Sequence, residues 1–201
     1  MKKIYKYLFP CLLVFIIFLN SGCDILTNFS LNLPLKQGIT VTGSNTTIDN
    51  SNTVYLSDFD AYSTNLDKIE SITYKAALYR TLPRGENPFP PPDSLDLTPG
   101  LVGERINVTV TDGNDNLIFS RDLPTAAADD YLTTPYDIDL EPGEIALIEG
   151  YLEYYKDPAR ASDLSFTARI TISNISAGAG PPYTLTGEIE LLLEIVMKPS
   201  S

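Results

Sequence analysis

The chain has 201 residues, and it contains no histidine, no tryptophan and only two cysteines. Without histidine it can form no Ser-His-Asp or Cys-His catalytic group, and it offers no imidazole ligand to zinc. Two cysteines are too few for a four-thiolate zinc site or for a disulfide framework. Because these shortages remove several common catalytic designs, we expect a protein that is not an enzyme and that needs no cofactor.

Basic residues are also scarce, since 14 Lys and Arg stand against 26 Asp and Glu and give a net charge of −12. Binding to nucleic acid depends on clustered Lys and Arg that contact phosphates, so the composition argues against it. Apolar residues, in contrast, make up 43% of the chain. At this length, that share is enough for one domain with a real hydrophobic core.

The first residues have the composition of an export signal. Lys2, Lys3 and Lys6 precede an apolar run from Leu8 to Leu19. As a helix, these twelve residues would span only about 18 Å, whereas the hydrocarbon core of a membrane is about 30 Å thick. The pattern therefore predicts a signal peptide rather than a transmembrane helix.

The apolar run ends in the sequence Leu19-Asn20-Ser21-Gly22-Cys23, which resembles the lipobox of bacterial lipoprotein signal peptides. The small residues before the cysteine match the family pattern, and Asn20 departs from it because the family usually has Leu there. The resemblance implies that the Cys23 thiol receives a diacylglycerol and that residues 1–22 are then removed. The mature chain would have 11 basic and 26 acidic residues, a net charge of −15.

This interpretation divides the chain into three parts. Residues 1–22 are the lipoprotein signal peptide, residues 23–28 are the anchor and a short tether, and residues 29–201 form a single domain. A diacyl group with an amide-linked chain is sufficient for stable attachment. We therefore expect a protein anchored to a membrane of the bacterial cell envelope, facing the periplasm or the cell surface, with the choice of inner or outer membrane left open.

The mature chain consists largely of short runs in which apolar and polar residues alternate, which is typical of strands with one buried face. The turn sequence Asp112-Gly113-Asn114-Asp115 predicts a hairpin between two of these runs. We also expect the last two runs to pair as an antiparallel hairpin. Together they predict an all-β, antiparallel, immunoglobulin-like β-sandwich, with strands over residues 29–35 and 39–42, 53–57, 68–80, 104–111, 116–121, 136–140, 164–172 and 183–197.

Two segments do not fit the strand pattern. Residues 81–100 are rich in proline and predict a connection outside the sheets. Glu141 to Asp157 has helical spacing of apolar residues, with Pro142 suited to a first turn and Pro158 placed to end the helix. We expect one short helix there, closing one end of the sandwich.

Two clusters of oxygen-bearing side chains are candidate sites. Asp112, Asn114 and Asp115 could bind calcium, but their spacing is not that of an EF-hand, and the same residues are typical of a hairpin turn. Glu188 and Glu190 lie on one strand face, about 6.6 Å apart, which is compatible with an acid/base pair. Because Glu on an outward strand face is also the usual means of keeping it soluble, we favour a turn and a solvated face.

Tyr62, Tyr151 and Tyr154 are the candidate ligand-binding residues, because aromatic rings beside carboxylates are common in glycan-binding sites. The alternative is that these rings pack into the core. The sequence as a whole predicts a lipid-anchored envelope protein with a non-enzymatic structural or protein-interaction role, with another envelope protein as its partner. The alternative is a β-sandwich module that binds a glycan or another small ligand.

Overall fold

The structure is a computed structural model, and it describes residues 29–82, 100–157, 159–160, 163–178 and 180–198. The expected signal peptide, Cys23, the tether and most of the proline-rich connection lie outside these residues. The elements in chain order are β1 (Phe29–Gly43), β2 (Ile48–Tyr55), η1 (Leu56–Asp58), α2 (Asp60–Ser63), η2 (Leu66–Lys68), β3 (Ile69–Thr81), β4 (Arg105–Asp112), β5 (Leu117–Asp122), η3 (Ala128–Tyr131), β6 (Tyr136–Asp137), α3 (Pro142–Tyr155), β7 (Ser165–Ser173) and β8 (Tyr183–Met197).

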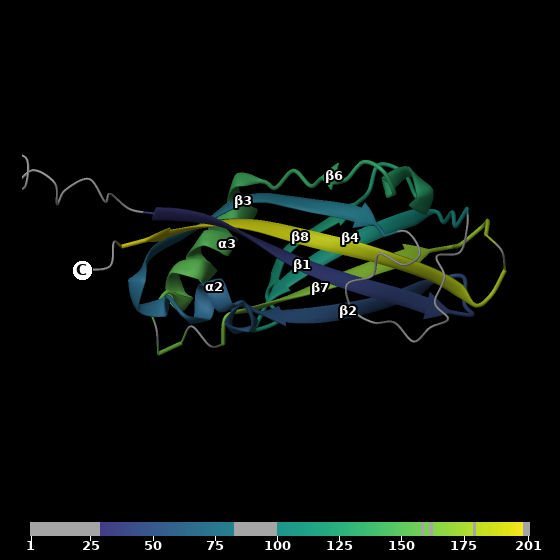
Figure 1. Cartoon of the computed structure of the whole chain (residues 1–201). Coiled ribbons are helices and arrows are strands. Elements are labelled where there is room, and N and C mark those ends of the chain that lie inside the picture. The colour runs from purple at the N-terminus through teal and green to yellow at the C-terminus, as the bar shows by residue number, and fades with distance from the viewer. Residues whose placement is uncertain (1–28, 83–99, 158, 161–162, 179, 199–201) are drawn as a thin grey trace, which may run out of the picture.

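The strands form two four-stranded sheets (Figure 1). Sheet A has the order β1-β8-β3-β6, sheet B has the order β2-β7-β4-β5, and every pairing is antiparallel. This confirms the predicted all-β antiparallel sandwich. The finer expectation of an immunoglobulin-like arrangement stays a prediction.

The core lies between the two sheets, where alternate side chains of each strand meet. Ile106, Val108 and Val110 of β4 are all fully buried, as the alternation predicted. The sheets approach closely at Gly187 of β8, where a Cβ atom would lie 2.6 Å from the Cδ1 atom of Ile170. A larger residue here would have to displace the ends of the Ile170 and Tyr79 side chains, so the close approach of the sheets favours glycine.

The predicted hairpin of the last two strands is wrong. β7 lies inside sheet B between β2 and β4, whereas β8 lies inside sheet A between β1 and β3. Each strand has one apolar face, and the chain crosses from one sheet to the other between Ser173 and Tyr183. The two apolar faces therefore meet across the core instead of lying side by side.

The sandwich is elongated, and its two ends differ (Figure 1). At one end β1 begins and β8 finishes, with Phe29 opposite Met197, and the helices α2 and α3 pack there. We refer to it as the helix end. At the other end Gly43 lies opposite Tyr183, and the turns between strands gather there. We refer to this end as the loop end.

Helix α3 confirms the predicted short helix. Pro142 occupies its first turn, and the Glu141 backbone N–H donates to the Glu144 carboxylate Oε2 over 2.8 Å. The helix contacts β3 and β5. It covers the core at the helix end with its buried side chains, which are Ile148, Tyr151, Leu152 and Tyr155.

Candidate functional site

The structure places two of the three predicted tyrosines in the interior. Tyr62 has no exposed surface, and burial raises the pKa of its hydroxyl to about 12. The Tyr151 hydroxyl accepts a hydrogen bond from the Gly113 N–H over 2.8 Å and donates one to the Ser165 carbonyl over 3.0 Å. Burial is also the main reason why the pKa of Tyr151 is raised. Both rings support the fold, so neither is available to a ligand.

Tyr154 is the one predicted tyrosine that faces solvent, with 56% of its surface exposed. The Arg160 guanidinium carbon lies 4.5 Å from the centre of its ring, which is the geometry of a cation–π contact. The edge of the ring also packs against Tyr155, with ring centres 5.0 Å apart. The three predicted tyrosines thus do not form a shared aromatic platform.

The Asp112 cluster forms the β4–β5 hairpin turn. One oxygen of the Asp112 carboxylate accepts hydrogen bonds from the backbone N–H groups of Asn114 and Asn116, over 2.8 and 2.9 Å. The other oxygen accepts one from the Asn116 side chain over 2.9 Å. Asp115 has a positive φ of 63°, as such turns require. Because N–H donors already surround the carboxylate, the arrangement suits a turn better than a calcium site.

The solvated face predicted for the β8 glutamates is wrong for Glu188, which is only 2% exposed. The Arg80 Nε atom from β3 lies 2.9 Å from its carboxylate, and Lys36 from β1 lies 3.9 Å away. Lys36 also pairs with Glu190 at 3.4 Å. The reason is the central position of β8, which places cations from both neighbouring strands against its acidic side chains. Glu188 and Glu190 therefore belong to an ion-pair network on sheet A.

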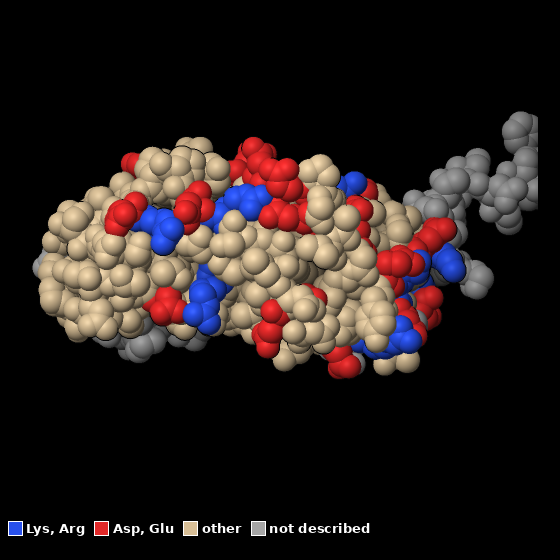
Figure 2. Space-filling view, turned by 180° about the vertical axis from the view of Figure 1, so that it is seen from behind, with Lys and Arg blue, Asp and Glu red and all other residues tan. Residues whose placement is uncertain are grey.

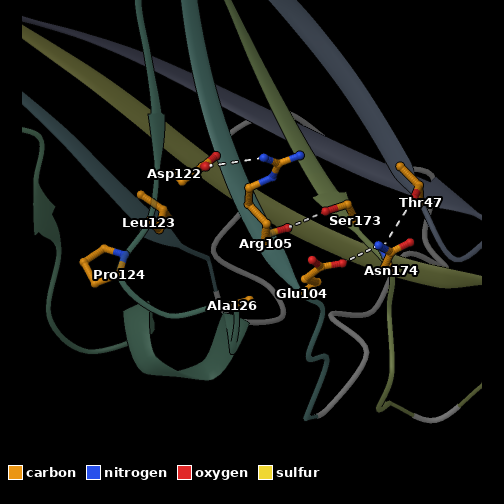
Figure 3. A pocket seen from close by; sticks show the side chains of 9 residues that line it. All are labelled: Thr47, Glu104, Arg105, Asp122, Leu123, Pro124, Ala126, Ser173 and Asn174. Atoms are coloured by element: carbon orange, nitrogen blue, oxygen red, sulfur yellow. Dashed lines mark hydrogen bonds and ion pairs between the residues drawn. The ribbon is translucent and has the colours of Figure 1, made fainter.

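A polar pocket of about 450 Å³ lies at the loop end of the molecule (Figure 3). It is formed where β4 and β2 begin and where β5 and β7 finish, so residues far apart in the sequence meet there. The lining residues are Thr47, Glu104, Arg105, Asp122, Leu123, Pro124, Ala126, Ser173 and Asn174. None of them was predicted as a site residue. Each lies at or beside the end of a strand, and no local sequence pattern indicates that these strand ends meet.

The polar groups of this loop-end pocket are held by contacts with one another (Figure 3). Arg105 pairs with Asp122 at 3.5 Å, and the side-chain amide of Asn174 donates to the Glu104 carboxylate. The Asn174 backbone N–H donates to the Thr47 hydroxyl over 3.3 Å, and Asn174 has a positive φ of 49°. Asparagine tolerates this conformation better than most residues, which favours it at this corner of the pocket.

The loop-end pocket borders the outer face of sheet B, which carries polar side chains. Asn107 of β4 donates to Asp122 over 2.8 Å and to the Ser120 hydroxyl over 3.1 Å. Thr109 lies 3.1 Å from the same Ser120 hydroxyl. Figure 2 shows the molecule from behind, with basic and acidic side chains side by side over its middle and uncharged side chains over its left end.

A second pocket, of about 400 Å³, lies along β3 and includes Tyr74, Lys75 and Asp139. Burial, with the negative charges of Asp139 and Glu144, raises the pKa of Tyr74 to about 12. The pairing of β3 with β8 is irregular here, with shifts in register between Ile69 and Ser71 and between Tyr74 and Ala76. The loop-end pocket brings two carboxylates, a guanidinium, an amide and hydroxyl groups together, so it is the better candidate for a binding site.

Among the described residues, no three Cys, Asp or Glu side chains gather in a way that could hold a metal ion. No helix among those residues is both long and apolar enough to cross a membrane.

Fold and site together define an all-β sandwich with a small polar pocket at one end. No family model matches the chain, and no curated protein matches it. A solved structure from Desmodium yellow mottle tymovirus is 9% identical, with a TM-score of 0.36, over 87% of this chain and 91% of that chain. A score this low indicates only a loosely similar shape and carries no information about function.

Proposed function

We propose that this protein is a lipid-anchored lipoprotein of the bacterial cell envelope with a non-enzymatic role in structure or protein interaction. The proposal joins two separate features of the chain. The lipobox-like sequence ending in Cys23 provides the anchor, and the elongated sandwich provides the part that extends from the membrane.

The position of β1 is the observation that carries this proposal. β1 begins at Phe29, at the helix end, only six residues after Cys23. Six residues reach about 20 Å at most, so an anchor on Cys23 would hold the helix end near the membrane. The 15 residues of β1 then extend for about 50 Å, which would place the loop end far from the lipid surface.

The composition of the loop end supports a role in contact with a partner. Residues 43–47, 100–103, 123–128, 174–178 and 180–183 of its described turns contain no Lys, Arg, Asp or Glu, whereas Asp129 and Asp130 lie beside them. The acidic residues of the loop end, such as Glu104 and Asp122, lie around the pocket, so the uncharged stretches of the turns can approach another acidic surface with less repulsion. Such an end suits a protein that meets its partner away from the membrane.

The anchor is tested by replacing Cys23 with alanine in the full chain. We expect the variant to leave the membrane fraction and to lose labelling by a fatty-acid probe. Cys11 gives a matched control, because its replacement by alanine should leave both readouts unchanged. Continued labelling of Cys23→Ala would show that the lipobox interpretation is wrong.

The orientation is tested with a photo-crosslinking amino acid in the anchored protein. Placed at Ser44 of the loop end, it should give crosslinks to another envelope protein, whereas the same group at Glu149 of α3 should not. Crosslinks from position 149 alone would contradict the proposed outward direction of the loop end.

A second candidate function is the binding of a glycan or another small ligand. The observation in its favour is the loop-end pocket, in which carboxylate, guanidinium, amide and hydroxyl groups lie within one hollow. The tyrosines expected to carry this function do not reach the pocket, since none of them lines it.

A further inference from the structure

The polar groups of the loop-end pocket suit a ligand that both donates and accepts hydrogen bonds at several neighbouring points. Glu104 and Asp122 accept, Arg105 donates, and Asn174 can do both. The internal pairs of the pocket leave capacity unused, because a carboxylate accepts about four hydrogen bonds. Adjacent hydroxyl groups on a sugar ring have this combination of donors and acceptors.

One wall of the loop-end pocket is apolar. Leu123, Pro124 and Ala126 follow β5 and line the side that faces Glu104 and Asn174 (Figure 3). Pro124 is exposed and Ala126 is half-buried, so both present carbon atoms to the hollow. The C–H face of a sugar ring can pack on such a surface while its hydroxyl groups turn toward the polar wall.

The charge of the pocket limits the kind of glycan. Two carboxylates, Glu104 and Asp122, stand against the single guanidinium of Arg105. This excess of negative charge disfavours sulfated, phosphorylated or carboxylated sugars, because like charges repel at short range. A neutral sugar or an amino sugar is compatible with it.

The outer face of sheet B continues the pocket. Asp122 and Arg105 belong to both, and the next positions inward are Asn107, Ser120 and Thr109, which are joined by hydrogen bonds. Neighbouring strands lie about 4.8 Å apart, so the polar side chains of this face form regular rows. A chain of sugar units leaving the pocket would meet amide and hydroxyl groups on each strand it crosses.

We propose that the loop-end pocket binds one unit of a linear neutral or amino-sugar glycan, and that the outer face of sheet B binds the units that follow. The proposal develops the second candidate function. It does not depend on the lipid anchor, so the membrane-fraction test of Cys23 and the glycan test below can fail independently.

The test measures binding by the full chain, purified in detergent, to oligosaccharides of glucose and of N-acetylglucosamine. We expect a hexasaccharide of one series to bind about tenfold more tightly than its disaccharide, because only the longer chain reaches the sheet. A sulfated hexasaccharide should bind more weakly. Absence of binding to both neutral series, or tighter binding of the sulfated one, would overturn the proposal.

Three variants separate the pocket from the sheet. Asp122→Ala and Glu104→Ala, both at exposed positions, should weaken the disaccharide and the hexasaccharide by about tenfold each. Thr109→Val keeps the shape of the side chain and removes its hydroxyl, so it should weaken only the hexasaccharide. Asp137→Ala, on sheet A, is the matched control and should bind like the parent chain. Equal affinities for all four variants would refute the assigned site.

A final arm distinguishes two sources of such a glycan. The protein is sedimented with purified peptidoglycan, which contains amino sugars, and separately with an insoluble glucose polymer. Sedimentation with peptidoglycan alone would identify a glycan of the envelope, and sedimentation with the glucose polymer alone would identify an external one. The proposal fails if, with both polymers, the amount of parent protein that sediments is no greater than the amount of the Asp122→Ala variant.

Discussion

At the helix end, side chains of helix α3 cover the core between the sheets, whereas at the loop end the core is covered by turns that backbone hydrogen bonds join to one another. Tyr151 and Leu152 of α3 are buried at the helix end. At the loop end, the Ser176 N–H donates to the Val102 carbonyl over 2.8 Å, and the Ile175 N–H donates to the Thr46 carbonyl over 2.7 Å. Both ends bury apolar side chains, including Leu101 and Ile175 at the loop end, but only the loop end is built from turns held together by backbone hydrogen bonds between distant segments.

The way in which each end is covered also affects which side chains are free to contact a ligand. When backbone groups hold a set of turns together, the side chains of those turns need not pack inward and can contact a ligand. At the helix end, most large side chains are already committed to the fold. The loop end is thus the part of the molecule where sequence changes should affect binding more than stability.

The largest expected effect comes from emptying the core of the helix end. Leu152→Ala should lower the free energy of unfolding by about 2–5 kcal/mol, because Leu152 is fully buried and its removal leaves a cavity. Urea unfolding followed by circular dichroism measures the change. Leu147→Ala on the same helix is the control, since Leu147 is 56% exposed and should change stability by less than about 0.5 kcal/mol. Equal losses in the two variants would contradict the assigned packing.

Removal of the Tyr151 hydroxyl should have the next largest effect. Tyr151→Phe keeps the ring and leaves the Gly113 N–H and the Ser165 carbonyl without this partner. We expect a loss of about 1–3 kcal/mol, the usual cost of unpaired buried polar groups. Tyr154→Phe should be close to neutral in the same unfolding assay, and a greater loss there would refute the role of the Tyr151 hydroxyl.

The packing of the loop-end turns can be tested by adding a Cβ atom where the backbone segments lie close together. In Gly103→Ala, the added Cβ atom would lie 2.6 Å from the Ser173 carbonyl oxygen, so the turn must shift. We expect a loss of about 1–3 kcal/mol, with faster amide hydrogen exchange confined to the turns of the loop end. In Gly143→Ala, no atom lies within 4 Å of the added group, and stability should not fall. Faster exchange at the helix end in Gly103→Ala would contradict independent closure of the two ends.

The smallest effect concerns the Glu144–Arg121 ion pair, which joins α3 to β5. Partial burial raises the pKa of Glu144, but hydrogen bonds from Arg121 and from the Glu141 N–H, with the attraction of the guanidinium, lower it by more. The folded pKa therefore lies below the ordinary value of about 4.3. The resulting stabilisation is present above that value and is lost as the pH falls through the folded pKa.

Glu144→Gln should accordingly lower stability by about 0.5–1 kcal/mol at pH 7. The difference from the parent chain should shrink as the pH falls through the lowered pKa, because Glu144 in the parent is then progressively protonated. Urea unfolding at pH 7 and at pH 3 measures both differences. A gap between the two proteins that is larger at pH 3 would contradict the lowered pKa.

Much of the sandwich was predictable because its signals are local. The alternation of Ile106, Val108 and Val110 with polar residues predicts a strand with one buried face, and the residues after Asp112 predict a hairpin turn. Pro142 marked the first turn of α3. Each of these features depends on residues that are adjacent in the sequence, and each was predicted correctly.

The errors arose where distant segments decide the outcome. The pattern of β8 is the same whether it pairs with β7 or with β1 and β3, so alternation alone could not identify its sheet. Glu188 is buried because Arg80 and Lys36 reach it from neighbouring strands. The loop-end pocket was missed for the same reason, since its polar residues come from four separate parts of the chain.

The pairing of β8 also affects the order in which the protein can fold. β8 lies between β1 and β3, so the pair that starts at Phe29 and Met197 joins residues from nearly opposite ends of the chain. Contacts of such long sequence separation form slowly, because a long loop must close before they stabilise the structure. Sheet A cannot assemble until the last fifteen-residue strand has been synthesised. Until β8 is available, β1 has no partner strand in sheet A, so half of the sandwich stays incomplete however early the rest of the chain folds.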